Sequence, residues 1–413
     1  MVRKLLTGNA AVAWGARLAD VDYIPAFPIT PQTEIIELLS GWCASGELPA
    51  KFVTLDSEHS MLTAAGAAAA TGVRTFTATS SQGLVYAMEV LYTVAGWRVP
   101  LVLVNVSRGL SAPITLGPDH NDVLAARDTG FIQLHAETCQ EVLDSVLIAY
   151  RLAEDRRVQV PVLVNLDGFF LSFTREPVEI PDVETVRAFL PPFRAAQPVF
   201  GDTPSVAQGV AVLEGSLYSF FRYQLPHAVC AARSVYAEVA VDFEHRFGRA
   251  YHPVDQYLLE DAEFVLVMIG SFSTKARCAI DRWRAAGKKV GLLRLRMVRP
   301  FPADDVSRLL CHRRAVGVID QNLSPGLGGI LFQEVAGALA GVAGPLPVLR
   351  SFVGGLGGKD ISPVEFDHVL DVLEAARPQA GPTPAELLFT QAEWEQTKNR
   401  LAIAGKSPDR SAS

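Results

Sequence analysis

Several residues in the first third of the sequence could bind a small acid. Arg108 follows a strongly apolar stretch, Leu101–Val106, and a guanidinium at the end of a buried strand can hold a carboxylate through two hydrogen bonds. Asp119, His120 and Asp122 follow shortly after it. The pattern indicates a site for a carboxylate substrate; the alternative is a salt bridge from Arg108 to Asp119 or Asp122.

A second polar string, Asp56–Ser60, surrounds Glu58. It follows a β-rich run and precedes an Ala-rich helical pattern. An acid at the carboxyl end of a strand in an open α/β sheet lies where ligands bind. Glu58 is therefore either a buried proton relay or a first-turn helix residue that interacts with the helix dipole.

Two further strings lie in comparable positions. Thr79–Gly83, which includes Ser81 and Gln82, offers hydroxyls, an amide and a helix N-terminus to a polar ligand, without the spacing of a phosphate-binding loop. In Phe27–Thr33 two prolines restrict the backbone, and Thr30 or Thr33 could cap the helix expected from about Glu34.

The elements that position these strings alternate between strand and helix. Strands are expected at 52–55, 75–79, 101–106 and 160–166, with Ala-rich helices at 61–71 and 84–95. Such alternation predicts an α/β fold with a parallel sheet covered by helices on both faces. Because the carboxyl ends of parallel strands meet at one edge, we expect the four strings to line a single crevice.

A second α/β unit is expected from about residue 258. Its strands are predicted at 264–269, 290–295, 315–319 and 348–352, and its helices at 275–286, 303–310 and 330–339. We therefore expect a first domain at 1–235, a connector at 236–257, a second domain at 258–376, and a tail at 377–413 that is partly disordered. The role of the segment 197–254 stays open.

Composition excludes several classes of protein. The chain has 413 residues and a net charge of -7 without a basic run, so we expect no nucleic-acid partner. No apolar run reaches the length of a membrane span, and no signal core follows the N-terminus. The five cysteines are scattered, which indicates reduced thiols in the cytoplasm and no iron–sulfur cluster or metal site held by this chain.

Taken together, the strings resemble the pyruvate:ferredoxin oxidoreductase family of 2-oxoacid:acceptor oxidoreductases. In the first half the resemblance rests on Phe27–Thr33, Asp56–Ser60, Thr75–Leu84, Ser107–Arg108 and Asp119–Asp122, and extends through Arg127–Gly130 and Asp167–Phe169. In the second half it rests on Glu260–Glu263, Gly270–Ser271, Val298–Pro302 and Gly355–Ile361. The resemblance implies a thiamine-diphosphate pyrimidine-binding domain followed by a transketolase C-terminal-like domain.

The resemblance also implies roles for single residues. Glu58 would hydrogen-bond the ring nitrogen of the cofactor's aminopyrimidine and tune its proton transfers. Thr30 and Arg108 would bind the carboxylate and oxo group of the substrate. The remaining matches are Pro28, Ile29, Ser81 and Gln82 as cofactor-binding residues, and Asp119, His120 and Asp122 as a loop that closes near the site.

The resemblance implies partner subunits as well. No diphosphate- and magnesium-binding motif is found, so a beta-type subunit would hold the diphosphate, Mg²⁺ and an iron–sulfur cluster. Gamma- and delta-type subunits with clusters would carry electrons to ferredoxin, or to NAD through a flavin subunit, with coenzyme A as co-substrate. We expect an oxidative decarboxylase of 2-oxoacids that is active only as a hetero-oligomer.

Three departures from the family pattern bear on the substrate. Phe27 replaces a common tyrosine, Gly109 replaces a common alanine, and Pro118 is inserted in the closing loop. Pyruvate is the commonest family substrate, and a smaller residue at 109 would suit a bulkier one such as phenylglyoxylate. The rival hypotheses are a non-catalytic assembly subunit, a decarboxylase without redox partners, and a nucleotide-binding α/β protein.

Overall fold

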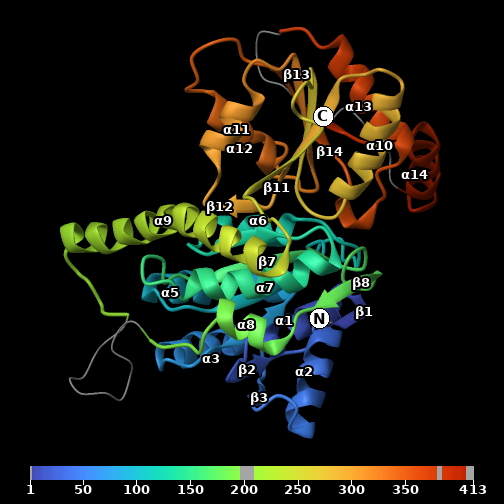
Figure 1. The fold of residues 1–413 in the computed structure, drawn as a ribbon. Helices are drawn as coiled ribbons and strands as arrows, with labels where there is room; N and C mark the ends of the chain where they lie inside the picture. Colours follow the sequence, from blue (N-terminus) through green and yellow to red (C-terminus); the bar gives the residue numbers. More distant parts are fainter. Residues whose placement is uncertain (1, 196–208, 379–383, 406–413) are drawn as a thin grey trace. The chain divides into compact units, whose positions relative to one another are not determined.

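The computed structural model describes residues 2–195, 209–378 and 384–405. Within them the chain forms two compact units (Figure 1). Unit 1 contains Met1–Pro253 and Arg296–Pro302, and unit 2 contains Val254–Leu295 and Ala303–Ser413. The disorder expected at 407–413 lies outside the described residues.

Unit 1 is built on a largely parallel sheet with the strand order β12-β6-β7-β5-β4. Only β12, which the chain adds when it returns from unit 2, runs antiparallel. A parallel pair, β2 and β3, is joined to this sheet by a bridge between Tyr23 and Thr75. The bounds are β2 Tyr23–Ala26, β3 Lys51–Thr54, β4 Phe76–Thr79, β5 Val102–Ser107, β6 Ile132–His135, β7 Val162–Asp167 and β12 Met297–Arg299.

The central strands of this sheet are buried along their whole length, because both faces are covered. Helix α7 packs on α1 and β7, and α3 packs on α5 and β2. An antiparallel pair, β1 (Val2–Thr7) with β8 (Arg175–Ile180), completes the unit. Its helices are α1 Gly8–Leu18, α2 Thr33–Ser45, α3 Glu58–Ala70, α4 Gln82–Tyr86, α5 Met88–Trp97, α6 Asn121–Ala125, η1 Ala126–Asp128, α7 Cys139–Ala153, α8 Val183–Phe189 and α9 Gly215–Phe247.

Helix α9 has 33 residues and crosses the domain boundary that the sequence suggested at residue 235. The residues on both sides of that position are buried within unit 1, including Ala232, Tyr236 and Phe243. Phe243 also packs edge-on against Phe189 of α8, with ring centroids 5.2 Å apart. The apolar stripe of α9 therefore keeps the chain in unit 1 as far as Pro253.

Unit 2 has a six-stranded sheet with the order β15-β14-β13-β10-β11-β9, in which β9 alone is antiparallel. Figure 1 shows α10 and α13 on one face of this sheet and α11 and α12 on the other. The strands are β9 Val254–Tyr257, β10 Phe264–Met268, β11 Val290–Leu295, β13 Ala315–Asp320, β14 Val348–Val353 and β15 Ala385–Leu387. The helices are α10 Ser273–Ala285, α11 Ala303–Leu310, α12 Ile330–Leu339, η2 Leu356–Gly358, α13 Pro363–Ala375 and α14 Gln391–Ile403.

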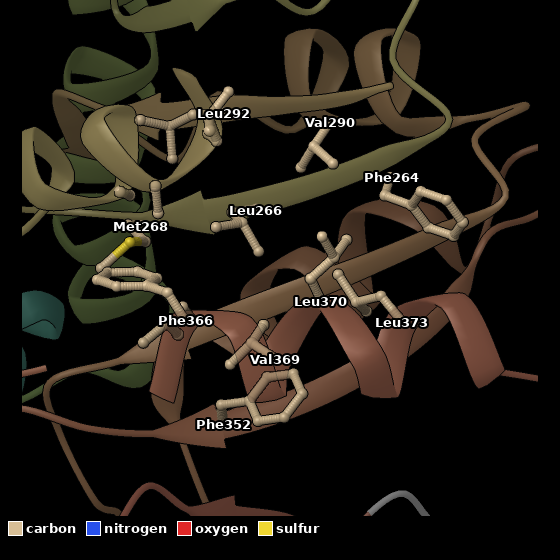
Figure 2. Close-up of a cluster of buried hydrophobic side chains, with 14 of the residues drawn as sticks. Phe264, Leu266, Met268, Val290, Leu292, Phe352, Phe366, Val369, Leu370 and Leu373 are labelled. Carbon is tan, nitrogen blue, oxygen red and sulfur yellow. The ribbon is translucent and has the colours of Figure 1, made fainter. Parts of the chain in front are cut away.

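One core cluster of unit 2 lies between the sheet and the helices α10 and α13. Figure 2 shows Phe366, Val369 and Leu373 of α13 facing Leu266 and Met268 of β10. Burial of these side chains stabilises the unit by roughly 1.5–3 kcal/mol each before entropic costs. Ser362 and Glu365 form a capping box that fixes where α13 begins.

Candidate functional site

Glu58 is the first residue of α3, and Ser57 caps the helix by accepting a hydrogen bond from Ser60 N. The Glu58 side chain is 7% exposed and lies beside Gly83 of α4. A Cβ on Gly83 would stand 2.6 Å from Glu58 Oε1 and 2.5 Å from Thr79 Oγ1. The absence of a side chain at 83 thus leaves room for a carboxylate and a hydroxyl on adjoining elements.

The turn between β4 and α4 carries Ser81 and Gln82. Ser81 adopts φ 51° and ψ -119°, a conformation that costs free energy in a residue with a Cβ. Its hydroxyl lies 2.6 Å from Gln82 Oε1 and 3.0 Å from Gly109 O, either of which can accept its one hydrogen, and its backbone N–H donates to Asp122 at 3.0 Å. These contacts hold the turn against the segment that follows β5.

Arg108 bridges the two segments that carry Thr30 and Gln82. Its Nη1 donates to Thr30 O at 2.6 Å, and its Nη2 donates to Gln82 Oε1. The side chain is 7% exposed, and burial lowers the pKa of Arg108 while the charges of Asp122 and Glu58 oppose that shift. Asp122 accepts a hydrogen bond from the backbone N–H of Arg108 at 3.2 Å. This contact involves the main chain of Arg108, whereas the salt bridge considered as the alternative would involve its guanidinium.

Pro28, Ile29 and Thr30 lie in the turn between β2 and α2, which brings them to the same edge of the sheet as Arg108. Gln32, buried, closes this turn through a hydrogen bond from its side chain to Phe27 O at 2.8 Å. The expectation that Thr30 or Thr33 caps α2 is wrong. Gln32 occupies the cap position without a side-chain hydrogen bond, since the closed turn places it there.

The residues expected in a closing loop are buried. His120 and Asp122 have 0% exposure and Asp119 has 5%. His120 Nε2 lies 2.7 Å from Asp167 Oδ1, and the Asp167 charge raises the pKa of His120 against the opposing effect of its burial. Burial raises the pKa of Asp122 to about 6. Buried polar contacts therefore hold this segment in place.

A row of polar side chains under this segment was not anticipated from the sequence. Strand register places Asn105, Asn165 and His135 side by side on β5, β7 and β6. Asn105 Nδ2 donates to Asn165 Oδ1 at 2.9 Å and to Asp122 at 3.1 Å. The available signal was an asparagine near the end of each of two otherwise apolar strands, 102–107 and 162–167.

Gly109 does not enlarge the site in the way that its size suggested. A Cβ at this position would lie 2.6 Å from Thr115 Cγ2 and 2.9 Å from Asp119 Oδ2. The space that an alanine side chain would fill is thus occupied by the segment 110–119. This segment folds back onto Gly109, whose backbone N–H donates a hydrogen bond to Gly117 O at 3.0 Å.

The donor set fits the pyrimidine half of thiamine diphosphate. Four buried polar atoms on the segments that carry this site have no protein partner, namely Thr79 Oγ1, which lies beside Gly83 as Glu58 does, Ser80 Oγ, Gln82 Nε2 and Arg108 Nε. Such atoms are costly to bury unless a ligand or water satisfies them. Within the described ranges no group of three or more His, Cys, Asp and Glu residues is arranged to hold a metal ion. No helix among these residues is both long and apolar enough to cross a membrane.

Sequence comparison identifies the family. The family model described as "Pyruvate flavodoxin/ferredoxin oxidoreductase, thiamine diP-bdg" matches residues 14–240, and "Pyruvate:ferredoxin oxidoreductase core domain II" matches residues 262–366. The chain therefore belongs to the 2-oxoacid:ferredoxin oxidoreductase family, as an alpha-type subunit, which confirms the resemblance and the predicted fold.

Three relatives illustrate the range of similarity. Pyruvate synthase subunit PorA of Methanothermobacter thermautotrophicus is 41% identical over 90% of this chain and 95% of its own length. The PorA subunit of Pyrococcus furiosus is 39% identical over 96% of this chain and 100% of its own. Ketoisovalerate oxidoreductase subunit VorA of Pyrococcus horikoshii is 37% identical over 96% of this chain and 98% of its own length.

Two solved structures share the fold. The 2-oxoglutarate:ferredoxin oxidoreductase of Magnetococcus marinus matches with a TM-score of 0.69 and 21% identity, over 90% of this chain and 65% of that chain. A split-gene transketolase, an inactive beta4 tetramer, matches with a TM-score of 0.52 and 14% identity, over 88% and 96% of the two chains. At these identities the likeness shows the fold alone.

Proposed function

We propose that this chain is the alpha subunit of a CoA-acylating 2-oxoacid oxidoreductase, which converts a 2-oxoacid and coenzyme A to an acyl-CoA and CO₂. The observation that carries this proposal is the convergence of Glu58, Arg108, Thr30 and Gln82 at one edge of the unit 1 sheet. Glu58 would hold the aminopyrimidine of thiamine diphosphate, with Pro28, Ile29, Ser81 and Gln82 around it. When bound, the cofactor supplies the carbanion chemistry that decarboxylation needs.

The residues of this chain would orient the substrate and exclude water. The buried Arg108 guanidinium, aligned by Thr30 O and Gln82 Oε1, is placed to hold the substrate carboxylate until CO₂ leaves. A carboxylate at Glu58, beside the Thr79 hydroxyl, is suited to keep a proton on a neighbouring ring nitrogen. Both groups act more strongly in a site of low dielectric than in water.

Pyruvate is the substrate that we favour. Relatives named as pyruvate synthase subunits are 39–41% identical to the chain, against 37% for a ketoisovalerate oxidoreductase subunit. The filled space beside Gly109 removes the reason for expecting a bulkier acid such as phenylglyoxylate. A branched 2-oxoacid is the second candidate, because of the similarity to that ketoisovalerate enzyme.

The proposal requires partner subunits. A beta-type subunit would hold the diphosphate, Mg²⁺ and an iron–sulfur cluster, and gamma- and delta-type subunits would pass electrons to ferredoxin, or to NAD through a flavin subunit. The family relatives are themselves named as subunits. The alternative is a non-catalytic assembly subunit, against which the intact set of polar residues around Glu58 weighs.

The test is an assay of the intact complex, purified without oxygen. Reduction of a viologen dye is followed with pyruvate, 2-oxoisovalerate, 2-oxoglutarate and phenylglyoxylate, each with and without coenzyme A. We expect CoA-dependent reduction that is fastest with pyruvate. If no 2-oxoacid supports dye reduction by a complex that contains every subunit, the assembly-subunit alternative is the better account.

A further inference from the structure

Asp122 joins the two segments that carry the substrate-site residues. Its Oδ2 accepts hydrogen bonds from Ser81 N at 3.0 Å, Asn105 Nδ2 at 3.1 Å and Arg108 N at 3.2 Å. Its Oδ1 accepts a fourth bond from Val123 N at 2.7 Å. The side chain has 0% exposure, so no water competes for these donors.

The Ser81 donor belongs to a strained turn of the site. Ser81 has a positive φ, 51°, in a residue that carries a Cβ. Strain of this kind persists only where surrounding contacts over-determine the conformation. The bond from Ser81 N to Asp122, and the contacts of the Ser81 hydroxyl with Gln82 Oε1 and Gly109 O, over-determine the turn in this way.

The consequence reaches the substrate through Gln82 and Arg108. Gln82 directly follows the strained residue and accepts a bond from the Arg108 guanidinium, while the Arg108 main chain is fixed by Asp122 itself. The buried Asp122 carboxylate therefore fixes the main chain of Arg108 and also the turn that carries Gln82, which aligns the Arg108 guanidinium. Asp122 does not contact the guanidinium, so its effect on the substrate is indirect.

We propose that Asp122 is a positioning residue, which fixes the Ser81 turn and the Arg108 main chain and thereby sets the guanidinium for the substrate carboxylate. This inference rests on the proposed function, because it assumes that Arg108 binds a 2-oxoacid. A carboxylate is needed at this position since four N–H donors converge on its two oxygens. Asparagine offers one acceptor and turns an amide N–H toward another donor.

The matched control is Asp144, a second buried aspartate of unit 1. It also has 0% exposure and is held by Arg249 and Tyr251. Loss of either carboxylate leaves buried donors without a partner, so both Asp122→Asn and Asp144→Asn should lower the unfolding temperature. Only the Asp122 variant should alter the kinetics of the 2-oxoacid.

The experiment compares the two variants in the intact complex by steady-state kinetics. For Asp122→Asn we expect the KM of the 2-oxoacid to rise about tenfold or more while the KM of coenzyme A stays within about twofold. Asp144→Asn should keep both constants. A 2-oxoacid KM in Asp122→Asn equal to that of the wild type overturns the proposal. An inactive wild-type complex would instead overturn the proposed function on which it rests.

A second variant covers the case in which Asp122→Asn fails to assemble. In the double variant Ser81→Gly/Asp122→Asn, glycine accepts the positive φ without strain, which favours assembly, while the Arg108 main chain still loses its carboxylate acceptor. We expect the double variant to assemble and to show a 2-oxoacid KM about tenfold above that of Ser81→Gly alone. Equal KM values in the two would overturn the proposal, because Asp122 would then not be needed to position Arg108.

Discussion

The close packing of Glu58 against Gly83 predicts that a side chain at residue 83 will lower activity, and the size of this effect can be estimated from distances. A Cβ at residue 83 would lie 2.5 Å from Thr79 Oγ1, 2.6 Å from Glu58 Oε1 and 2.8 Å from Glu58 Cγ. Carbon atoms make favourable contact at about 3.5–4.0 Å, so the Glu58 carboxylate must move by roughly 1 Å to admit a methyl group. A displacement of that size at a reacting centre can lower the rate about 100-fold.

We therefore expect Gly83→Ala to lower kcat/KM for the 2-oxoacid by about 100-fold and to cost about 1–3 kcal/mol of stability through overpacking. The control is Gly41→Ala in α2, where nothing lies within 4 Å of the new Cβ. That change should stabilise the helix by up to about 1 kcal/mol and leave the activity unaltered. Dye-reduction kinetics and thermal unfolding of the complex measure both effects. Retention of wild-type activity in Gly83→Ala would refute the placement of Glu58 beside the cofactor.

Two further predictions concern Arg108 and Asp122. In Arg108→Lys the ammonium cannot bridge Thr30 O and Gln82 Oε1 at once, so we expect the 2-oxoacid KM to rise about 10- to 100-fold. The control is Arg98→Lys, which removes another arginine that binds two carbonyls and should lower stability only. A rise in KM for both variants would count against the role of Arg108. Because the pKa of Asp122 is raised to about 6 and its ionised form accepts the three N–H groups on Oδ2, kcat/KM should fall as the pH is lowered through about 6. The free energy of unfolding should change in the opposite direction to kcat/KM. Because the carboxyl pKa is raised, the native state binds the proton more tightly than the unfolded state, and the contribution of Asp122 to stability grows as the pH falls from about 6 towards 4. Kinetics and thermal unfolding across this range separate the two effects, and a flat rate profile would contradict the assignment.

The strands of both sheets were predictable because they are buried on both faces and form apolar runs. The expected strands at 101–106 and 160–166 correspond to β5 and β7, and those at 290–295 and 315–319 to β11 and β13. Shorter strands such as β6 were missed, since Ile132–His135 is half polar and its polar side chains join a buried network. The strand β12 could not be foreseen, because it pairs with β6 across a long separation in the sequence.

The site was predictable as a set of segments but not as a set of contacts. Each string follows a strand, and parallel strands place such strings at one edge, which is where the structure brings Thr30, Gln82 and Arg108 together. The link from Arg108 to Asp122 through the main chain was missed because residue types cannot show which atom of an arginine makes a contact. The space beside Gly109 was misjudged for a similar reason, since its occupant depends on how the segment 110–119 folds back.

Substitution of Glu58 by glutamine in the intact complex tests the central claim most directly. The matched control is Glu34→Gln, because Glu34 is also a first-turn carboxylate, in α2, and accepts a hydrogen bond from the Thr7 hydroxyl, so the variant measures what the loss of such a carboxylate does away from Glu58. We expect Glu58→Gln to assemble and to lose CoA-dependent 2-oxoacid oxidation by about 100-fold or more, and Glu34→Gln to remain active. Full activity in Glu58→Gln, or an equal loss in both variants, would contradict the account.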